Sequence, residues 1–430
     1  MKTAVILAGG KGTRLAEIRS DVPKPMMPVL DKPLLAYQIE LLKAHGFTKV
    51  WLIVNHLYEH IEDYFANGEH FGIEINYYIE DKPLGTVGGL KAIAQHLTDP
   101  FLVLYGDVMM NMDLNRLIAF HENKNADATL VVHPNDHPYD SDLLAVDQED
   151  RVTAFYAKPH PDGLRYRNLV NAAAYVFNPV VLEHLESGVK ADFGKDIFPT
   201  LHAKLNVFAY NTPEYLKDMG TPDRLKKVEE ALKSGNVSAR NLNNKQRCVF
   251  LDRDGVINID TDLIDRPEDL ELYPYAASSI RRLNKMGFLV VVVTNQSVIA
   301  RGLCTIATLD EIHKKMETEL GQKGAFVEAI YFCPHHPHSG YEGEVKEYKV
   351  ECSCRKPKPG MLLEAAERFN IDLTKSYLVG DSARDIEAGA RAGVETIRVK
   401  TGHGLKPHTE VPMNYVADLV AAVDLIEGQS

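Results

Sequence analysis

The sequence lacks long apolar runs, and that absence excludes one class of protein at the outset. Nothing in its 430 residues approaches the roughly 20 consecutive apolar residues that a membrane-spanning helix needs. The amino terminus turns to glycine and lysine directly after Ala8, which is too early for a signal peptide. We therefore expect a cytoplasmic protein that has no membrane partner.

Positive charge is also in short supply. The formal net charge of -12 argues against a nucleic-acid backbone or an anionic membrane as the main partner. It leaves phosphorylated small molecules open as substrates, because local lysine, arginine and backbone N–H groups can hold them. Cysteine is scarce and odd in number, with five residues, so a reducing compartment is favoured over a secreted disulfide framework.

Apart from these absences, the composition is that of a soluble globular protein, with 45% hydrophobic and 25% charged residues. The length predicts two or more domains. No internal repeat is visible, and the sequence leaves open whether the chain forms a homo-oligomer.

Short β-branched runs alternate with amphipathic stretches in both halves, which predicts an α/β fold in each. A polar, turn-rich segment at 235–246 is the predicted linker between domains at 1–234 and 247–430. Helices are expected at Leu34–His45, Tyr58–Asn67 and Thr221–Lys233, with Pro222 at a first helical position. Strands are expected at Thr3–Leu7, Val50–Val54, Phe101–Leu104, Ala128–Val132, Val207–Tyr210, Cys248–Leu251, Leu289–Thr294, Ala329–Phe332, Ser376–Val379 and Thr396–Val399.

The first chemical motif is a glycine-rich turn that follows a strand, Ala8-Gly9-Gly10-Lys11-Gly12-Thr13-Arg14. Glycines let backbone N–H groups approach phosphate oxygens closely, and a following helix start adds a favourable dipole. Arg14 and Lys24 supply two cations that suit a triphosphate. A plain strand–helix turn would explain the glycines by themselves. The other motifs of the first half must therefore show whether this turn binds phosphate.

Further motifs follow this turn in order along the first half. They are Glu80-Asp81-Lys82-Pro83-Leu84-Gly85-Thr86, Tyr105-Gly106-Asp107, Ala157-Lys158-Pro159, Asn171-Ala172 and Asp218-Met219-Gly220-Thr221-Pro222. In this order they resemble the sugar-1-phosphate nucleotidyltransferase family, over about residues 1–230. The resemblance implies a Rossmann-like, GT-A-like domain with a mixed sheet.

The implied reaction is in-line attack of a sugar phosphate oxygen on the α-phosphorus of a nucleoside triphosphate, catalysed mainly by positioning and charge neutralisation. By the resemblance, Arg14 and Lys24 would hold the triphosphate, and Lys158 would hold the phosphate of the sugar. Asp107 and Asp218 would hold Mg²⁺, which prefers carboxylate and phosphate oxygens. The remaining substrate-binding positions would be Ala8, Gly9, Gly10, Gly12, Thr13, Glu80, Gly85, Thr86 and Asn171.

Two positions depart from the family on the sugar side. Ala157 stands where Glu often precedes the lysine, and Ala173 stands where Gly often follows Asn-Ala. The motifs therefore define the type of reaction more closely than they define the sugar. For the base, Glu80 and Asp81 could accept hydrogen bonds from the N1–H and amino groups of guanine, which would make GTP the substrate. A solvated acidic turn is the alternative.

The second half opens with Asp252 and Asp254 at the end of an apolar strand, on the same side of the extended chain. With the later Thr294-Asn295, Arg355-Lys356 and Asp381, they resemble the four ordered motifs of haloacid-dehalogenase-type phosphatases. The resemblance implies a Rossmannoid domain in which Asp252 attacks phosphorus and Asp254 is general acid and base. Asp252, Asp254 and Asp381 would hold Mg²⁺, and Thr294, Asn295, Arg355 and Lys356 would contact the substrate.

Cys333, His335, Cys352 and Cys354 have the count and spacing of a closed tetrahedral zinc site. Because four protein ligands leave no open position, the predicted Zn²⁺ is structural and would hold the loop that carries Arg355. The insert resembles the zinc loop of heptose-bisphosphate and histidinol-phosphate phosphatases.

Together the two resemblances imply a bifunctional enzyme of nucleotide-activated heptose synthesis. Removing the 7-phosphate of D-glycero-D-manno-heptose 1,7-bisphosphate leaves a heptose 1-phosphate, to which the other domain would transfer GMP from GTP. The product would be a precursor for surface polysaccharide such as lipopolysaccharide. Three alternatives stay open: a mannose-1-phosphate guanylyltransferase or another hexose-1-phosphate enzyme in the first half, a histidinol-phosphate phosphatase in the second half, and a non-catalytic scaffold in the first half.

Overall fold

The chain forms two compact units. The computed structural model describes residues 1–10, 21–405 and 414–429. The first unit comprises Met1–His133, Ser141–Pro159 and Leu169–Asn241. The second comprises Pro134–Asp140, His160–Asn168 and Leu242–Ser430, so two short segments from the first half of the sequence fold with the second unit.

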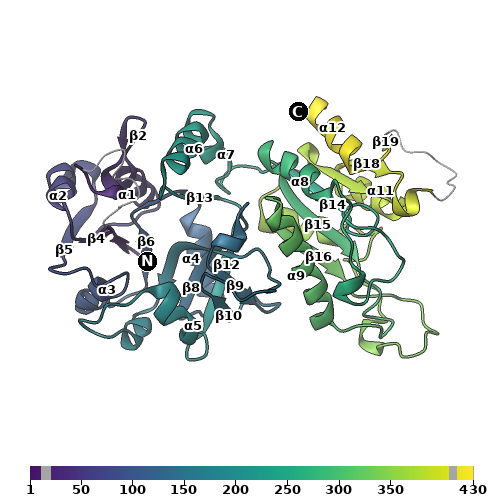
Figure 1. The fold of residues 1–430 in the computed structure, drawn as a ribbon, viewed down its shortest axis with the longest axis horizontal. Helices are drawn as coiled ribbons and strands as arrows, with labels where there is room; N and C mark the ends of the chain where they lie inside the picture. Colours follow the sequence, from purple (N-terminus) through teal and green to yellow (C-terminus); the bar gives the residue numbers. More distant parts are fainter. Residues whose placement is uncertain (11–20, 406–413, 430) are drawn as a thin grey trace. The chain divides into compact units, whose positions relative to one another are not determined.

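The first unit is built on a mixed sheet (Figure 1). Its strands, as far as the structure describes them, have the order β10-β9-β11-β6-β1-β4-β5, with β8 beside β11 and β12 beside β8. Strands β6, β1, β4 and β5 are parallel, whereas β11 runs antiparallel to β6 and β8. The bounds are β1 (Thr3–Leu7), β4 (Lys49–Val54), β5 (Glu74–Ile79), β6 (Phe101–Tyr105), β8 (Ala128–His133), β9 (Leu143–Val146), β10 (Val152–Tyr156), β11 (Val170–Phe177) and β12 (Val207–Asn211).

Alternation along the central strand β1 divides the core of this unit between the two faces of the sheet. Ala4 and Ile6 join one apolar cluster, and Val5 joins the other. The first face is covered by α1 (Leu34–Ala44), α2 (Glu59–Phe65) and α4 (Leu114–Asn123). The second is covered by α3 (Gly88–Ala92) and α5 (Phe198–Leu201).

Smaller elements complete the first unit. Helix α6 (Pro222–Lys233) begins with Pro222 after Thr221, whose hydroxyl accepts the Arg224 N–H at 3.4 Å. Strand β2 (Pro28–Val29) pairs with β3 (Lys32–Pro33), and β7 (Val108–Asn111) pairs with β13 (Tyr215–Asp218), so that each pair forms a two-stranded ribbon. A short helix, α7 (Asn236–Ala239), follows α6.

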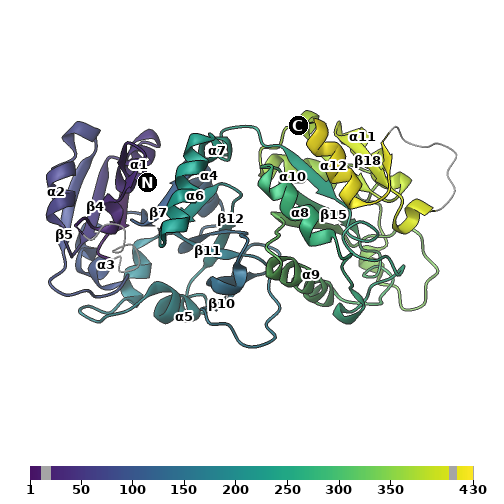
Figure 2. The same cartoon turned by 45° about the horizontal axis from the view of Figure 1, so that its top comes forward.

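The second unit contains a parallel sheet of order β16-β15-β14-β17-β18-β19. Figure 2 labels strands β15 and β18 of this sheet. One face is covered by α8 (Ala276–Lys285), α9 (Ile306–Gln322) and α12 (Leu419–Gln429), the other by α10 (Gly360–Arg368) and α11 (Ala383–Ala392). The strands are β14 (Cys248–Leu251), β15 (Leu289–Asn295), β16 (Ala329–Cys333), β17 (Tyr377–Gly380), β18 (Glu395–Val399) and β19 (Tyr415–Val416). Strand order reverses beside β14, the place where α/β sheets bind ligands.

The expected strands are present, with bounds that agree with the prediction or differ from it by one residue at one or both ends. The expected helix at Tyr58–Asn67 ends earlier, at Phe65, because Ala66 takes a positive φ of 44°. The segment predicted as a linker contains helix α7. The domain bounds 1–234, 235–246 and 247–430 stay a prediction. No helix among the described residues is long and apolar enough to cross a bilayer.

Candidate active sites

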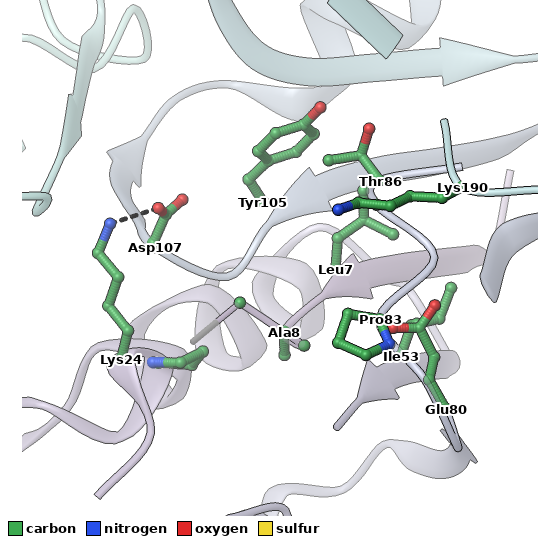
Figure 3. Close-up of a pocket in the computed structure, with 14 residues that line it drawn as sticks. Leu7, Ala8, Lys24, Ile53, Glu80, Pro83, Thr86, Tyr105, Asp107 and Lys190 are labelled. Carbon is green, nitrogen blue, oxygen red and sulfur yellow. Dashed lines mark hydrogen bonds and ion pairs between the residues drawn. The ribbon is translucent and has the colours of Figure 1, made fainter. Parts of the chain in front are cut away.

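A cavity of about 590 Å³ lies in the first unit where its parallel strands end. Ala8 follows β1, Glu80 follows β5 and Asp107 lies just after β6, so one edge of the sheet gathers them. Figure 3 shows Lys24 and Lys190 on opposite sides of this space. The lining residues include Gly9, Gly10, Lys24, Gly85, Thr86, Tyr105 and Lys190.

Lys24 and Asp107 lie at one end of the cavity, and Asp218 is close to Lys24 but is not among the described residues that line the cavity. The Lys24 Nζ atom lies 2.5 Å from an Asp107 carboxylate oxygen, and the backbone N–H of Met219 donates to the Asp107 carbonyl at 2.9 Å. Burial opposes ionisation of Asp218, yet Arg224, at 2.6 and 2.7 Å from its two oxygens, holds the pKa of that carboxyl below its usual range.

The Asp107 and Asp218 side chains are 33% and 42% exposed, so their oxygens can reach a ligand. Oxygen donors of this kind suit a hard divalent cation such as Mg²⁺. No sequence motif indicated the Asp218–Arg224 pair, because the two residues meet only where the chain passes from β13 into α6.

The opposite end of the cavity is formed around Glu80. Its side chain is buried, one carboxylate oxygen has no hydrogen-bond partner within the described structure, and burial raises its pKa. Gly85 has a φ of +76°, and a Cβ there would come within 2.2 Å of the Ala191 carbonyl, so only glycine fits. The Thr86 hydroxyl donates to Asp192 at 3.2 Å and accepts the Phe193 N–H at 2.9 Å.

Lys158 and Asn171, both expected on the sugar side, are linked through one residue. The Lys158 N–H donates to an Asp142 carboxylate oxygen at 3.0 Å, and the Asn171 N–H donates to the Asp142 carbonyl at 2.9 Å. Neither is among the described residues that line the cavity. Lys190, which the sequence did not single out, does line it. The expected binding residues Gly12, Thr13 and Arg14 lie outside the described residues.

In the second unit, the ends of β14, β15 and β17 place the predicted phosphatase residues together. Lys356, 2% exposed, lies 2.9 Å from Asp252 and 2.6 Å from Asp385, and it donates to the Val293 carbonyl at 2.8 Å. Burial opposes the charge of Lys356, but the two carboxylates raise its pKa. Asn295 holds the backbone of Lys356 from both sides, at 3.0 and 3.1 Å. Lys356 therefore sits as a fixed positive charge beside the predicted nucleophile.

Asp254 is held by a network of its own. The fully buried Arg253 donates to it from Nε at 3.0 Å and from Nη2 at 2.9 Å, and Gln296 and Asn258 donate at 2.8 and 3.0 Å. Burial alone would raise the pKa of Asp254, but Arg253 and the two amides lower it. Gln296 also donates to the buried Thr294 hydroxyl at 2.8 Å.

A group of carboxylates suited to a metal ion forms next to Asp252. One oxygen from each of Asp252, Asp381 and Asp385 lies within 4.8 Å of the others. Burial and then the nearby Asp385 raise the pKa of Asp381 to about 6. The His403 N–H donates to Asp381 at 2.6 Å. The two residues are 22 positions apart in sequence, and no motif predicted their contact. These oxygens fit Mg²⁺. Asp385 belongs to this group, whereas the Asp254 carboxylate does not.

The four expected zinc ligands also meet. Cys354 Sγ lies 3.3 Å from Cys352 Sγ and 3.5 Å from His335 Nδ1, and Cys333 Sγ lies 3.5 Å from Cys352 Sγ. Tetrahedral Zn²⁺ with Zn–S of about 2.3 Å requires ligand separations of about 3.5–3.8 Å, so the donor set fits that ion. All five cysteines are free, and Arg355 donates from Nη1 to the His335 carbonyl at 2.8 Å.

Comparisons with known proteins match the two halves of the chain to different families. The nucleotidyl transferase family model matches residues 3–235, and an HAD-hydrolase-like model matches residues 353–423. A UTP–glucose-1-phosphate uridylyltransferase of Synechocystis is 36% identical over 236 residues, which is 51% of this chain and 61% of that protein. The chain thus spans about three fifths of the length of that relative.

For the second half, a D-glycero-beta-D-manno-heptose-1,7-bisphosphate 7-phosphatase of Escherichia coli is 41% identical over 181 residues, which cover 41% of this chain and 93% of that protein. Among solved structures, HddC from Yersinia pseudotuberculosis complexed with GMP-PN matches 54% of this chain and 100% of its own length. Its identity is 26% and its TM-score 0.47.

Proposed function

This chain belongs to the nucleotidyl transferase family through residues 3–235 and to the HAD-like phosphatases through its second half, and from that premise we propose that it is a bifunctional enzyme of activated-heptose synthesis. The second unit removes the 7-phosphate of D-glycero-D-manno-heptose 1,7-bisphosphate. The first unit then joins the resulting heptose 1-phosphate to a nucleoside monophosphate. Both reactions use small phosphorylated substrates, in keeping with a cytoplasmic enzyme.

In the phosphatase reaction, an Asp252 oxygen attacks the 7-phosphorus, and the P–O bond to the sugar breaks. Asp254 delivers a proton to the departing sugar oxygen and later takes one from the water that hydrolyses the aspartyl phosphate. Lys356 neutralises charge on the phosphoryl oxygens, since it lies 2.9 Å from Asp252. Mg²⁺ held by Asp252 and Asp381 would supply further charge neutralisation.

In the transferase reaction, an oxygen of the heptose 1-phosphate attacks the α-phosphorus of the triphosphate, and pyrophosphate leaves. Lys24 and Lys190 are the described cations of the cavity, and both are suited to the phosphate oxygens. Asp107 and Asp218 would hold Mg²⁺, which would offset charge on the triphosphate. One buried oxygen of Glu80 has no hydrogen-bond partner among the described residues, which favours guanine, because guanine presents two N–H donors on one edge. The nucleotide is therefore proposed to be GTP.

One observation carries this proposal: a single chain joins a unit 41% identical to a heptose-bisphosphate phosphatase over 93% of its length to a nucleotidyl transferase unit. The product of that phosphatase is a sugar 1-phosphate, the class of substrate that the other reaction consumes. Histidinol phosphate would yield no such product.

The test is incubation with heptose 1,7-bisphosphate of each anomer, Mg²⁺ and each of GTP, UTP, ATP and CTP in turn. Phosphate and pyrophosphate are measured separately. We expect both to be released with GTP, together with a nucleotide-heptose product. Turnover with UTP in place of GTP would refute the role of Glu80, and release of neither ion would refute the heptose assignment.

Asp252→Asn separates the two reactions. It removes the nucleophile, so phosphate release from the bisphosphate should stop while pyrophosphate release from heptose 1-phosphate and GTP continues. If a folded Asp252→Asn variant lost both activities, the idea that the two active sites work independently would be wrong.

A further inference from the structure

One carboxylate of the first unit stands among the residues expected to bind the sugar but belongs to none of the motifs. Asp142 lies directly before β9, and its side chain is half-buried. One of its carboxylate oxygens, Oδ1, accepts the Lys158 N–H at 3.0 Å, and its carbonyl accepts the Asn171 N–H at 2.9 Å. Two hydrogen bonds therefore fix Asp142 between Lys158 and Asn171.

The other carboxylate oxygen, Oδ2, points into a corner formed by Gly194. A Cβ at Gly194 would come within 2.8 Å of Asp142 Oδ2 and 3.4 Å of Asp192 Oδ1. No protein donor among the described residues bonds to Asp142 Oδ2. Glycine at 194 thus leaves room for this carboxylate, and the carboxylate keeps one acceptor for a ligand.

The corner is connected to the cavity through Asp192. Asp192 Oδ2 accepts the hydroxyl of Thr86, a cavity-lining residue, at 3.2 Å, and its Oδ1 accepts the N–H groups of Gly194 and Lys195 at 3.0 and 3.3 Å. Described donors bond to both carboxylate oxygens of Asp192 but not to Asp142 Oδ2. Asp142 Oδ2 is therefore the oxygen that we assign to a ligand. One such oxygen is too few for a divalent cation, which needs about six oxygen ligands.

We propose that Asp142 is a specificity-determining residue of the transferase, which accepts hydrogen bonds from hydroxyl groups of the sugar 1-phosphate. This inference rests on the proposed function and deepens it. A carboxylate repels the phosphate end of the substrate and attracts its hydroxyl donors. Ala157, beside Lys158, offers no side-chain acceptor, whereas the carboxylate of Asp142 does.

The test is Asp142→Asn, which keeps an oxygen for the Lys158 N–H and turns the Oδ2 acceptor into a donor. The affinity for heptose 1-phosphate should fall roughly 10- to 100-fold, because hydrogen bonds to a charged group are lost. The KM for GTP should stay within about twofold. Asp63→Asn, an exposed carboxylate on α2, is the matched control and should change neither value.

Gly194→Ala tests the same corner without touching the carboxylate. The new Cβ would displace Oδ2, so binding of the sugar phosphate should weaken in this variant too. In Asp142→Asn/Gly194→Ala the two effects should not add, because both remove one interaction. Deoxy analogues of the sugar phosphate identify the hydroxyl that bonds to Asp142. The analogue that lacks this hydroxyl should bind the Asp142→Asn variant as tightly as it binds the wild type.

Binding is measured by calorimetry as well as by turnover, so that the inference and the proposed function can fail separately. A wild-type enzyme that transfers nucleotide, with an Asp142→Asn variant of unchanged sugar affinity and unchanged thermal unfolding, overturns the inference and leaves the proposed function standing. A wild-type protein that neither binds nor uses any sugar 1-phosphate overturns both.

Discussion

Lys356→Met should destabilise the phosphatase unit far more than any surface change nearby. The lysine is 2% exposed, and its ammonium lies between Asp252 at 2.9 Å and Asp385 at 2.6 Å. Methionine has a similar length but no charge, so the variant leaves two carboxylates uncompensated in the interior. Breaking a buried pair by removing one partner costs about 3–5 kcal/mol. For a domain of this size that corresponds to a fall in Tm of roughly 6–20 °C.

Lys358→Met is the control, since Lys358 is two residues away and forms an exposed pair with Glu351 at 2.8 Å. An exposed pair contributes about 0–1 kcal/mol, so this variant should unfold close to the wild type. Scanning calorimetry of both variants, with phosphate release assayed on the same samples, checks the prediction. If Lys356→Met unfolds at the wild-type temperature, the buried pair does not stabilise the domain and the reasoning fails.

Three further variants test other parts of the two units. Cys352→Ser should lower the zinc content of the purified protein and the thermal stability of the phosphatase unit, whereas Cys304→Ser should leave the metal content unchanged; equal zinc in both would refute the ligand set. Lys24→Ala should slow pyrophosphate release by roughly 100-fold or more and spare phosphate release, while Lys226→Ala on α6 should affect neither. Burial, followed by nearby arginine side chains, lowers the pKa of His313 well below 6.5. The unfolded state therefore binds the proton more readily, and the stability that neutral His313 confers is present above pH about 6.5 and lost as the pH falls. His313→Gln should flatten the dependence of Tm on pH below that value; an unchanged slope would contradict this assignment.

The strands that carry both sites were predictable because they are buried on both faces and read as continuous apolar runs. Strands Thr3–Leu7 and Cys248–Leu251 begin and end at the expected residues. Since catalytic groups of an α/β sheet follow the ends of its strands, Asp107 and Asp252 could be located with them. The cluster of Cys333, His335, Cys352 and Cys354 was equally predictable, because these residues form two pairs that are close in sequence.

Contacts between residues far apart in sequence could not be predicted in this way. The His403 N–H reaches Asp381 because a loop after β18 folds back across the strand ends. The segment 160–168 folds with the second unit because Arg167 pairs with Asp310 and Glu317 on α9. Asp142 belongs to no motif, and its position becomes visible only when β9 is placed beside β11. Each of these depends on tertiary packing that no local pattern encodes.

The electrostatics of the phosphatase site run against the roles that its two aspartates are proposed to play. Burial raises the pKa of Asp252, although the nucleophile must be ionised, and Arg253 lowers the pKa of Asp254, although the acid must carry a proton. The charges of the bound groups have the sign needed to reverse both shifts. A divalent cation held by Asp252 and Asp381 would favour the ionised nucleophile, and a bound phosphate dianion would oppose ionisation of Asp254. Substrate and metal would therefore both favour the protonation states that the proposed mechanism needs at Asp252 and Asp254.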